Sequence, residues 1–285
     1  MRNLGKLIRR AVTYVYPQQA KDSYLILQDM EIRNIKTEIA AKTPMDISLK
    51  GFKVFSQNEE DGIIQAIFNE LGTGKTFIEI GTGDGKECNT INLLFHGWKG
   101  VWFEGSEKAV NKIKSELGSV SFPNFQVKQT FIDLNNIESL ITDAVNFLNA
   151  DIDFFSLDID SNDYYILNAI LGKKIFPKVI CVEYNAKFPP PMRVKNEYKA
   201  DQTWNEDDYM GASLMCWVDL LELNNYSLLC CTVTGVNAFF VHNDYINKFH
   251  KYSVNELYRP SKYYISKRVS GHPVNLKNLK LVLGS

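Results

Sequence analysis

The sequence predicts an α/β protein with a Rossmann-like sheet of five parallel βα units followed by an antiparallel hairpin. The composition is that of a globular domain, because 45% of the 285 residues are hydrophobic and 23% are charged, close to the average for soluble proteins. Short β-rich runs alternate with helical stretches from residue 76 to residue 184, which is typical of βα units. The last two β-rich runs flank the tight turn Thr234-Gly235, so we expect them to pair antiparallel.

The elements follow one another at regular spacing. Each β-rich run contains β-branched or aromatic residues, and parallel strands covered by helices on both faces explain why these runs are so apolar. The parallel strands are expected at 76–80, 100–104, 125–132, 153–159 and 178–184, and the helices between them at 89–95, 107–117, 137–148 and 164–171. The terminal unit is expected to contain a helix at 213–223 and two strands at 226–233 and 237–241.

We divide the chain into three parts. Residues 1–45 are a helical extension, 46–250 the main domain, and 251–285 a C-terminal tail to which the sequence assigns no role. In the extension, apolar residues recur at helical spacing over 4–15 and again over 27–39. The extension is interpreted as a cap on the domain, as an arm that forms a homo-oligomer, or as a membrane-surface helix.

The charge balance argues against nucleic acid as a partner. Lys and Arg together number 32, and Asp and Glu number 33, which gives a net charge of −1. Binding to a phosphate backbone normally needs a clear basic excess. We therefore do not expect nucleic acid as the main partner.

The cysteines and the hydropathy pattern predict a cytoplasmic protein. The five cysteines are odd in number and show no CxxC spacing, as expected of free thiols in a reducing compartment. Residues 223–243 lack charge but contain many Asn, Ser and Thr side chains, so they do not read as a transmembrane helix. The basic start of the chain is interrupted by Pro17 and two glutamines, so no secretion signal is predicted.

A glycine loop follows the first predicted strand and precedes a helix. Its glycines, Gly81, Gly83 and Gly85, are spaced GxGxG, with Glu79 two residues before the first. A dinucleotide fingerprint would read GxGxxG. The pattern ExGxGxG instead resembles motif I of S-adenosylmethionine-dependent methyltransferases. The alternative interpretation of Glu79 is a carboxylate that caps a turn or a helix.

Further candidates for cofactor binding lie beside this loop. Glu104 ends the second strand, where a carboxylate can accept two hydrogen bonds from a ribose diol; otherwise it is an ordinary solvated glutamate. Gln57, before the first strand, is expected to close over the methionine end, and Asp133, after the third strand, to meet the adenine amino group. A helix start explains Gln57 equally well. Thr82 and Gly105 complete the candidate set.

Carboxylates cluster at the ends of the fourth and fifth strands. Asp158 and Asp160 lie on one side of the fourth strand because side chains alternate with a period of two. Glu183 and Asn185 end the neighbouring strand, so these oxygens converge at the carboxyl edge of the sheet. The set suits Mg²⁺, with Mn²⁺ or Ca²⁺ as alternatives. Without a metal, one aspartate would act as a general base, and the simplest interpretation is an Asp/Asn turn that caps the next helix at Asp163.

The segment after the fifth strand is the expected place for the acceptor. Tyr209, Gly211 and Ser213 are candidates for its pocket, and the triple proline before Arg193 and Lys195 predicts a stiff, basic lid.

Several blocks of the sequence resemble the FkbM-like family of class I S-adenosylmethionine-dependent methyltransferases. The blocks are SQNEEDGIIQAIF, FIEIGTGDGKECNT, GWKGVWFEGS, FFSLDIDSNDYYI, VICVEYNAKFPP, DYMGASL and NAFFVHND, between about residue 52 and about residue 245. The resemblance implies that 46–250 is a methyltransferase domain whose sheet ends in an antiparallel strand, and that it methylates an acceptor, commonly at a hydroxyl, in bacterial glycan or secondary-metabolite biosynthesis. Ser161 departs from the family pattern, in which a glycine is expected.

The leading hypothesis is therefore an S-adenosylmethionine-dependent O-methyltransferase that acts on a sugar or a similar small polar acceptor, with Asp158 and Asp160 as catalytic residues. One alternative takes Asp158-Ile-Asp160 as the DxD motif of a metal-dependent glycosyltransferase, although such an enzyme needs neither the glycine loop nor Glu104. A second alternative is a non-catalytic subunit that has kept the methyltransferase fold.

Overall fold

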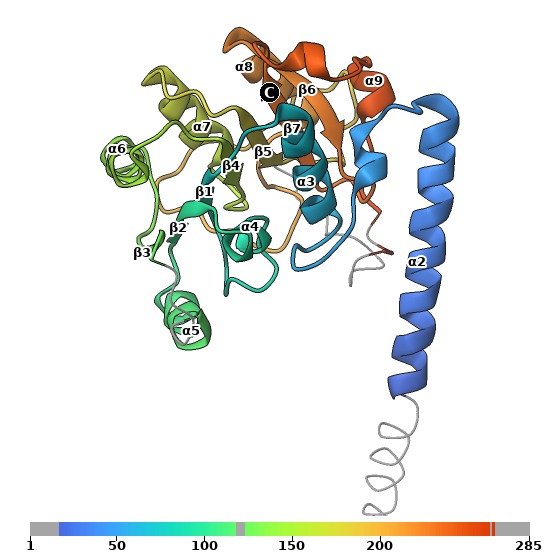
Figure 1. Ribbon diagram of the computed structural model, residues 1–285, viewed down its shortest axis with the longest axis horizontal. Coiled ribbons are helices and arrows are strands. Elements are labelled where there is room, and N and C mark those ends of the chain that lie inside the picture. The colour runs from blue at the N-terminus through green and yellow to red at the C-terminus, as the bar shows by residue number, and fades with distance from the viewer. Residues whose placement is uncertain (1–16, 118–122, 263, 266–285) are drawn as a thin grey trace, which may run out of the picture.

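The computed structural model describes residues 17–117, 123–262, 264 and 265. Its centre is a seven-stranded sheet with the strand order β3-β2-β1-β4-β5-β7-β6 (Figure 1). The strands are β1 (Thr76–Ile80), β2 (Lys99–Glu104), β3 (Phe125–Gln129), β4 (Phe154–Leu157), β5 (Val179–Glu183), β6 (Tyr226–Cys231) and β7 (Asn237–His242).

The pairing confirms the predicted fold class. The first five strands are parallel to their neighbours, whereas β7 is antiparallel to both β5 and β6. Because β7 inserts between β5 and β6, the sheet ends in an antiparallel hairpin with β6 as its edge strand. The predicted strands 125–132, 153–159 and 178–184 are each shorter in the structure, since their last residues turn into loops at the carboxyl edge.

Helices cover both faces of the sheet. Residues of α6 (Ile137–Leu148), α7 (Asp163–Gly172) and α8 (Leu214–Leu223) pack on the face that carries Ile78 and Ile80. Residues of α3 (Glu60–Leu71), α4 (Ile91–Phe95) and α5 (Glu107–Leu117) pack on the opposite face. The period-two alternation of each strand separates these two cores, and the ends of β1, β2, β4 and β5 meet at one edge.

The N-terminal extension contains one long helix in the described residues, α2 (Pro17–Lys42), which includes the second stretch predicted to be helical. The first stretch lies outside the described residues. Near its C-terminal end α2 is anchored to the domain, because Ile35 and Ile39 are buried against Val233 and Ile265. In Figure 1 the other end of α2 extends past the domain, and no helix in the described residues is long and apolar enough to cross a membrane.

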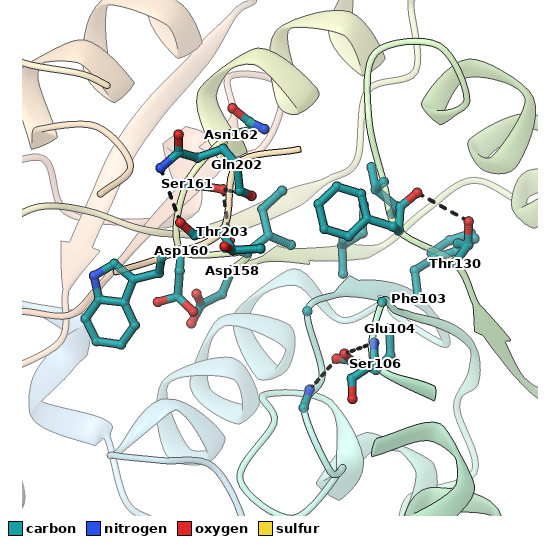
Figure 2. Close-up of a pocket in the computed structure, with 18 residues that line it drawn as sticks. Phe103, Glu104, Ser106, Thr130, Asp158, Asp160, Ser161, Asn162, Gln202 and Thr203 are labelled. Atoms are coloured by element: carbon teal, nitrogen blue, oxygen red, sulfur yellow. Dashed lines mark hydrogen bonds between the residues drawn. The ribbon is translucent and has the colours of Figure 1, made fainter. Parts of the chain in front are cut away.

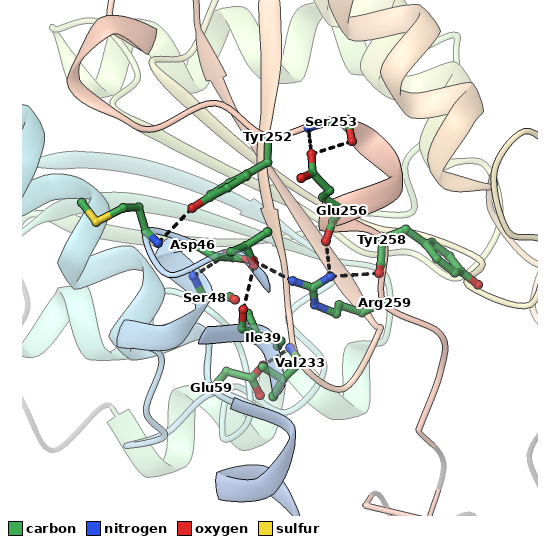
Figure 3. Close-up of polar contacts among 12 residues, drawn as sticks. Ile39, Asp46, Ser48, Glu59, Val233, Tyr252, Ser253, Glu256, Tyr258 and Arg259 are labelled. Atoms are coloured by element: carbon green, nitrogen blue, oxygen red, sulfur yellow. Dashed lines mark hydrogen bonds and ion pairs between the residues drawn. The ribbon is translucent and has the colours of Figure 1, made fainter. Parts of the chain in front are cut away.

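A buried ion pair joins the segment after α2 to the C-terminal segment (Figure 3). Asp46 precedes the short helix η1 (Ile47–Lys50), and Arg259 follows α9 (Val254–Leu257). The Arg259 Nη2 lies 2.7 Å from the Asp46 Oδ2, and Asp46 also accepts a hydrogen bond from the Ser48 amide. The segment after Arg259 closes over the β6–β7 turn, where a Cβ on Gly235 would lie 2.4 Å from the Pro260 carbonyl oxygen.

We predict that the exposed apolar residues at positions 25–30 of α2 associate with a second copy of the chain. Leu25, Ile26, Leu27 and Met30 are 48 to 64% exposed there, a concentration of apolar surface that association would bury. Deletion of residues 1–30 keeps Ile35 and Ile39, and it should lower the mass measured by light scattering to that of the monomer.

Two point variants sharpen this test. Leu27→Asp should give the same shift as the deletion, while Leu223→Asp, at a leucine that is 87% exposed on α8, should leave the mass unchanged. A full-length chain that is already monomeric would rule out association through α2.

Candidate functional site: a cavity at the carboxyl edge

A cavity of about 530 Å³ opens where the parallel strands end (Figure 2). This is the edge at which doubly wound sheets bind their ligands, and the volume lies in the range of small-molecule sites. Its walls come from the loops after β1, β2, β3 and β4, and from a segment between β5 and α8. The lining residues are Ile80, Gly81, Gly83, Phe103, Glu104, Gly105, Ser106, Thr130, Phe131, Ile132, Asp158, Ile159, Asp160, Ser161, Asn162, Gln202, Thr203 and Trp204.

The three glycines of the loop have three different surroundings. All have a positive φ, the conformation that favours glycine. A Cβ on Gly81 would lie 1.6 Å from the Asp158 carbonyl oxygen, and one on Gly85 would lie 3.0 Å from Ile113 and from Trp102. A Cβ on Gly83 would have no atom within 4 Å. Gly81 and Gly85 are thus needed for packing, and only Gly81 and Gly83 line the cavity.

Glu79 lies behind the loop and does not line the cavity. Its carboxylate accepts hydrogen bonds from the backbone amides of Asn89 and Thr90, at 2.8 and 3.0 Å, and from the Thr90 hydroxyl. Burial raises the pKa of Glu79 to about 7, although these hydrogen bonds act in the opposite direction. The structure therefore gives Glu79 the role of fixing the returning end of the glycine loop.

Glu104 faces the cavity from the end of β2. Its two oxygens accept from the backbone amides of Gly83 and Ser106, at 2.7 and 2.8 Å, and Figure 2 shows both contacts. Each carboxylate oxygen has a further lone pair, so Glu104 can still accept from a diol in the cavity. Gly105 follows it in the wall and leaves space beside Phe131.

The wall near Glu104 is apolar. Phe103, Phe131 and Ile132 line it, which suits a flat ring. Asp133 is adjacent but is not part of the cavity wall, and its carboxylate accepts from the amides of Asn135 and Asn136 in the turn before α6.

Two other predicted cofactor residues are also absent from the wall. Gln57 is exposed, and its backbone carbonyl accepts from Lys53. Thr82 is buried, and its Oγ1 has no hydrogen-bond partner. The structure thus brings Gly81, Gly83, Glu104 and Gly105 together around the cavity but leaves Gln57, Glu79, Thr82, Gly85 and Asp133 outside it.

Asp158 and Asp160 lie across the cavity from Glu104 (Figure 2). Asp160 has a φ of 59°, a left-handed conformation that aspartate adopts more readily than most residues. The left-handed residue of this turn is therefore Asp160, which explains why Ser161 is accepted where a glycine was expected. Asp163 fixes the turn, since its carboxylate accepts from the amides of Ile159 and Ser161 at 2.8 and 2.9 Å.

Three carboxylates form a group at this end of the cavity. Asp158, Asp160 and Glu183 each offer an oxygen, and these oxygens lie within 4.8 Å of one another. Burial is the main cause, and the charge of Asp160 the second cause, that raises the pKa of Asp158 well above its ordinary value. Burial and the charge of Asp158 raise the pKa of Glu183 in the same way. Such a group needs a proton or a cation to offset the repulsion. An all-oxygen donor set of this kind fits Mg²⁺.

Asn185 takes a different role from the one predicted. Its side-chain amide donates to the carbonyls of Asp208 and Met210, at 2.9 and 3.1 Å, and its Oδ1 accepts from the Lys187 amide at 3.3 Å. These contacts hold the segment before α8, so we do not include Asn185 among the oxygens available to a metal.

The segment between β5 and α8 supplies part of the cavity wall, but through other residues than the predicted Tyr209 and Ser213. Gln202, Thr203 and Trp204 line the cavity, whereas Tyr209 accepts from the Glu197 amide and Ser213 donates to the Met192 carbonyl. The segment contains no periodic pattern. The one feature of the sequence that could have identified Trp204 as a cavity residue is that it is an aromatic residue in a polar segment.

The basic lid that was expected here does not reach the cavity. Arg193 forms hydrogen bonds to both oxygens of Asp219, and the Lys195 Nζ lies 4.9 Å from the centre of the Tyr164 ring. The segment is held over the cavity edge by polar contacts instead. The side-chain Nδ2 of Asn162 donates to the Lys199 carbonyl at 2.7 Å, and the Ser161 hydroxyl donates to the Gln202 carbonyl at 3.4 Å.

Comparison with known proteins adds little to this geometry. No protein-family model matches the chain, and no curated protein matches it. Among solved structures, the N-terminal domain of EvdMO1 with SAH bound is 12% identical, with a TM-score of 0.42, over 73% of this chain and 94% of that one. The O-methyltransferase from Bacillus cereus in complex with SAH is 19% identical, with a TM-score of 0.41, over 82% and 95%. Similarity at this level assigns neither a family nor an activity, so the resemblance to the FkbM-like family stays a prediction.

Glu79 predicts how stability depends on pH. Its pKa of about 7 in the folded protein exceeds the ordinary value of 4.5, so the folded state binds the proton more tightly than the unfolded state. This contribution to stability is complete below the ordinary pKa and is lost as the pH rises through about 7. In urea titrations between about pH 5 and about pH 8, Glu79→Gln should flatten the fall in unfolding free energy, by at most about 1.4 kcal/mol per pH unit.

The absolute stability of Glu79→Gln should also be lower, because a glutamine offers one acceptor oxygen to three donors. Glu222→Gln, at an exposed glutamate of α8, is the matched control. Equal slopes in Glu79→Gln and the wild type would show that Glu79 does not carry the extra proton.

Proposed function

We propose that the protein is an S-adenosylmethionine-dependent methyltransferase that transfers the methyl group to a hydroxyl of a sugar or a related small polar acceptor. The observation that carries this proposal is the cavity at the carboxyl edge, in which Glu104 lies on one side and Asp158 and Asp160 on the other, with Gly83 also in the wall. The resemblance of the sequence to FkbM-like enzymes of bacterial glycan and secondary-metabolite biosynthesis supports the same assignment.

The residues present fit S-adenosylmethionine. The apolar wall of Phe103, Phe131 and Ile132 suits the adenine ring, and the Glu104 carboxylate suits the ribose diol. The open space above Gly83, which a Cβ would occupy, suits the methionine part. The cofactor carries a sulfonium cation, and a cavity lined by carboxylates favours a cation.

The bound cofactor supplies an electrophilic methyl group, and the chain's own residues must align and deprotonate the acceptor. Held beside Gly83 and Glu104, S-adenosylmethionine would supply the methyl group to the acceptor oxygen and would leave as the neutral thioether S-adenosylhomocysteine. The hydroxyl proton passes to the carboxylate group of Asp158, Asp160 and Glu183. Burial and the charge of Asp160 raise the pKa of Asp158, so its ionised form is a stronger base than an ordinary aspartate.

A divalent cation is the second form of the same proposal. Mg²⁺ held by Asp158, Asp160 and Glu183 would lower the pKa of the acceptor hydroxyl and position it. Asp160 and Asp158 also keep the DxD glycosyltransferase alternative open, but the contact between Glu104 and the Gly83 amide favours the methyltransferase. We further propose a cytoplasmic location, because all five cysteines are free, buried thiols in the described part of the chain.

The cofactor assignment is tested by titrating S-adenosylhomocysteine in a calorimeter. The wild type should bind it, and Gly83→Val should not, because the side chain would fill the space above the loop. Gly97→Val is the matched control, since Gly97 also has a positive φ and a Cβ there would have no atom within 4 Å, but Gly97 does not line the cavity. Binding of a nucleotide sugar with Mn²⁺, and not of S-adenosylhomocysteine, would replace the methyltransferase assignment by the glycosyltransferase. Binding of neither would favour the non-catalytic subunit.

Glu104→Ala should weaken the same binding by about 1.5 to 3 kcal/mol, the range for hydrogen bonds to a charged group. Gly83 and Glu104 are the two partners of one hydrogen bond, so both variants should weaken the binding of S-adenosylhomocysteine if the ribose diol lies on Glu104. A loss below about 0.5 kcal/mol would remove Glu104 from the cofactor site.

The chemistry is assigned to Asp158 and Asp160. Asp158→Asn or Asp160→Asn should lower turnover at least about a hundredfold while S-adenosylhomocysteine still binds. The asparagine keeps the left-handed turn at position 160, so the loss reports on the charge. Asp143→Asn, at an exposed aspartate of α6, should have full activity. If chelation removes activity and Mg²⁺ restores it, the metal form of the proposal is correct. If chelation has no effect, the carboxylates act as a general base. Normal turnover in both variants would exclude Asp158 and Asp160 from the chemistry.

A further inference from the structure

The charge of the cavity wall bears on which acceptors can enter. Glu104, Asp158 and Asp160 are its ionisable residues, and Lys, Arg and His are absent from the described residues that line it. Glu183 adds a fourth carboxyl group next to Asp158. A wall of this kind repels an anion and accepts a neutral or a cationic molecule.

Three basic residues of the surrounding loops are already paired with carboxylates. Lys187 lies 2.6 Å from the Asp208 carboxylate, Arg193 is paired with Asp219, and Lys112, on the cofactor side, is paired with Asp84. A phosphate on the acceptor would therefore have to compete with an existing carboxylate for each of these cations. The wall thus lacks the arginine or lysine clamp by which phosphates are usually held.

The acceptor side of the cavity also has a distinct shape. Trp204 contributes an indole ring whose Nε1 donates to the Asp207 carbonyl at 2.7 Å, so the orientation of the ring is fixed. Thr203 and Gln202 add hydroxyl and amide groups beside it. An apolar flat surface bordered by hydrogen-bonding groups and carboxylates matches a ring with one apolar face and several hydroxyl groups.

We infer that the acceptor is a hydroxyl-bearing sugar ring without phosphate or carboxylate, either neutral or carrying an amine, and that it lies against Trp204 with a hydroxyl toward Asp158 and Asp160. This inference rests on the proposed function and narrows its substrate class. Nucleotide-linked sugars and sugar phosphates are excluded by the charge of the wall. The reaction that supplies the acceptor must therefore deliver the sugar after its activating phosphate has been lost, as a glycosyl transfer does.

The test uses the full-length protein and three charge states of one sugar: D-glucose, D-glucosamine and D-glucose 6-phosphate, each also as the galactose and mannose counterparts. Binding is measured by saturation-transfer NMR, with and without S-adenosylhomocysteine and with and without Mg²⁺. We expect signals from at least one neutral sugar and from its amine, and at least about tenfold weaker binding of its phosphate, which corresponds to about 1.4 kcal/mol.

Two variants connect the result to the wall. Trp204→Ala should remove the sugar signal and leave the affinity for S-adenosylhomocysteine within about threefold, a change of about 0.7 kcal/mol. Phe176→Ala is the matched control, because Phe176 is an aromatic residue that is 44% exposed just before the amino end of β5. Asp160→Asn should narrow the difference between the neutral sugar and its phosphate, because it removes a negative charge and keeps the turn.

The possible failures are distinct. Loss of the proposed function appears as no binding of S-adenosylhomocysteine to the wild type. The acceptor inference is overturned, with cofactor binding intact, if a sugar phosphate binds as well as its neutral counterpart in either the presence or the absence of Mg²⁺. It is also overturned if no sugar of the panel binds, or if Trp204→Ala leaves the sugar signal unchanged.

Discussion

The contact between Gly81 and the backbone of Asp158 is the constraint on which the site depends. The amide of Asp158 donates to the Ile80 carbonyl at 3.1 Å, and the amide of Gly81 donates to the Phe103 carbonyl at 3.0 Å. The end of β1 is therefore fixed between β2 and β4, so closely that a Cβ on Gly81 would overlap the Asp158 carbonyl oxygen. This close approach sets the distance between the glycine loop, with Glu104 beside it, and the carboxylates at the end of β4.

The fold could be predicted from the sequence because its signals are local. Runs such as those of β1 and β5 are almost entirely buried, and the turn at Gly235 specifies a hairpin. The candidate site was predicted where topology alone determines it. Gly83, Glu104, Asp158 and Asp160 each end a strand or follow one directly, and parallel strands bring such residues to one edge.

The remaining assignments depended on side-chain direction and on the path of loops, which a period of two does not give. Glu79 is on β1 with its carboxylate toward the opposite face from Ile80, so it binds the backbone before α4 and not a ligand. Asn185 lies two residues beyond Glu183, where the chain has left the sheet. Trp204 is far from any strand, and the segment that contains it is held at the cavity by Asn162 and Ser161.

The acidic groups of the site also explain how binding and stability are connected. The pKa values of Glu79, Asp158, Asp163 and Glu183 are all raised, which means that ionisation of these groups destabilises the folded protein. Any positive charge that enters beside Asp158 and Glu183, whether a proton, a sulfonium or a divalent cation, offsets part of that cost. A cationic ligand that binds there relieves the repulsion between these carboxylates, and this relief adds to its affinity. Under the proposed function, this arrangement of charge favours the sulfonium of the cofactor and disfavours an anionic acceptor.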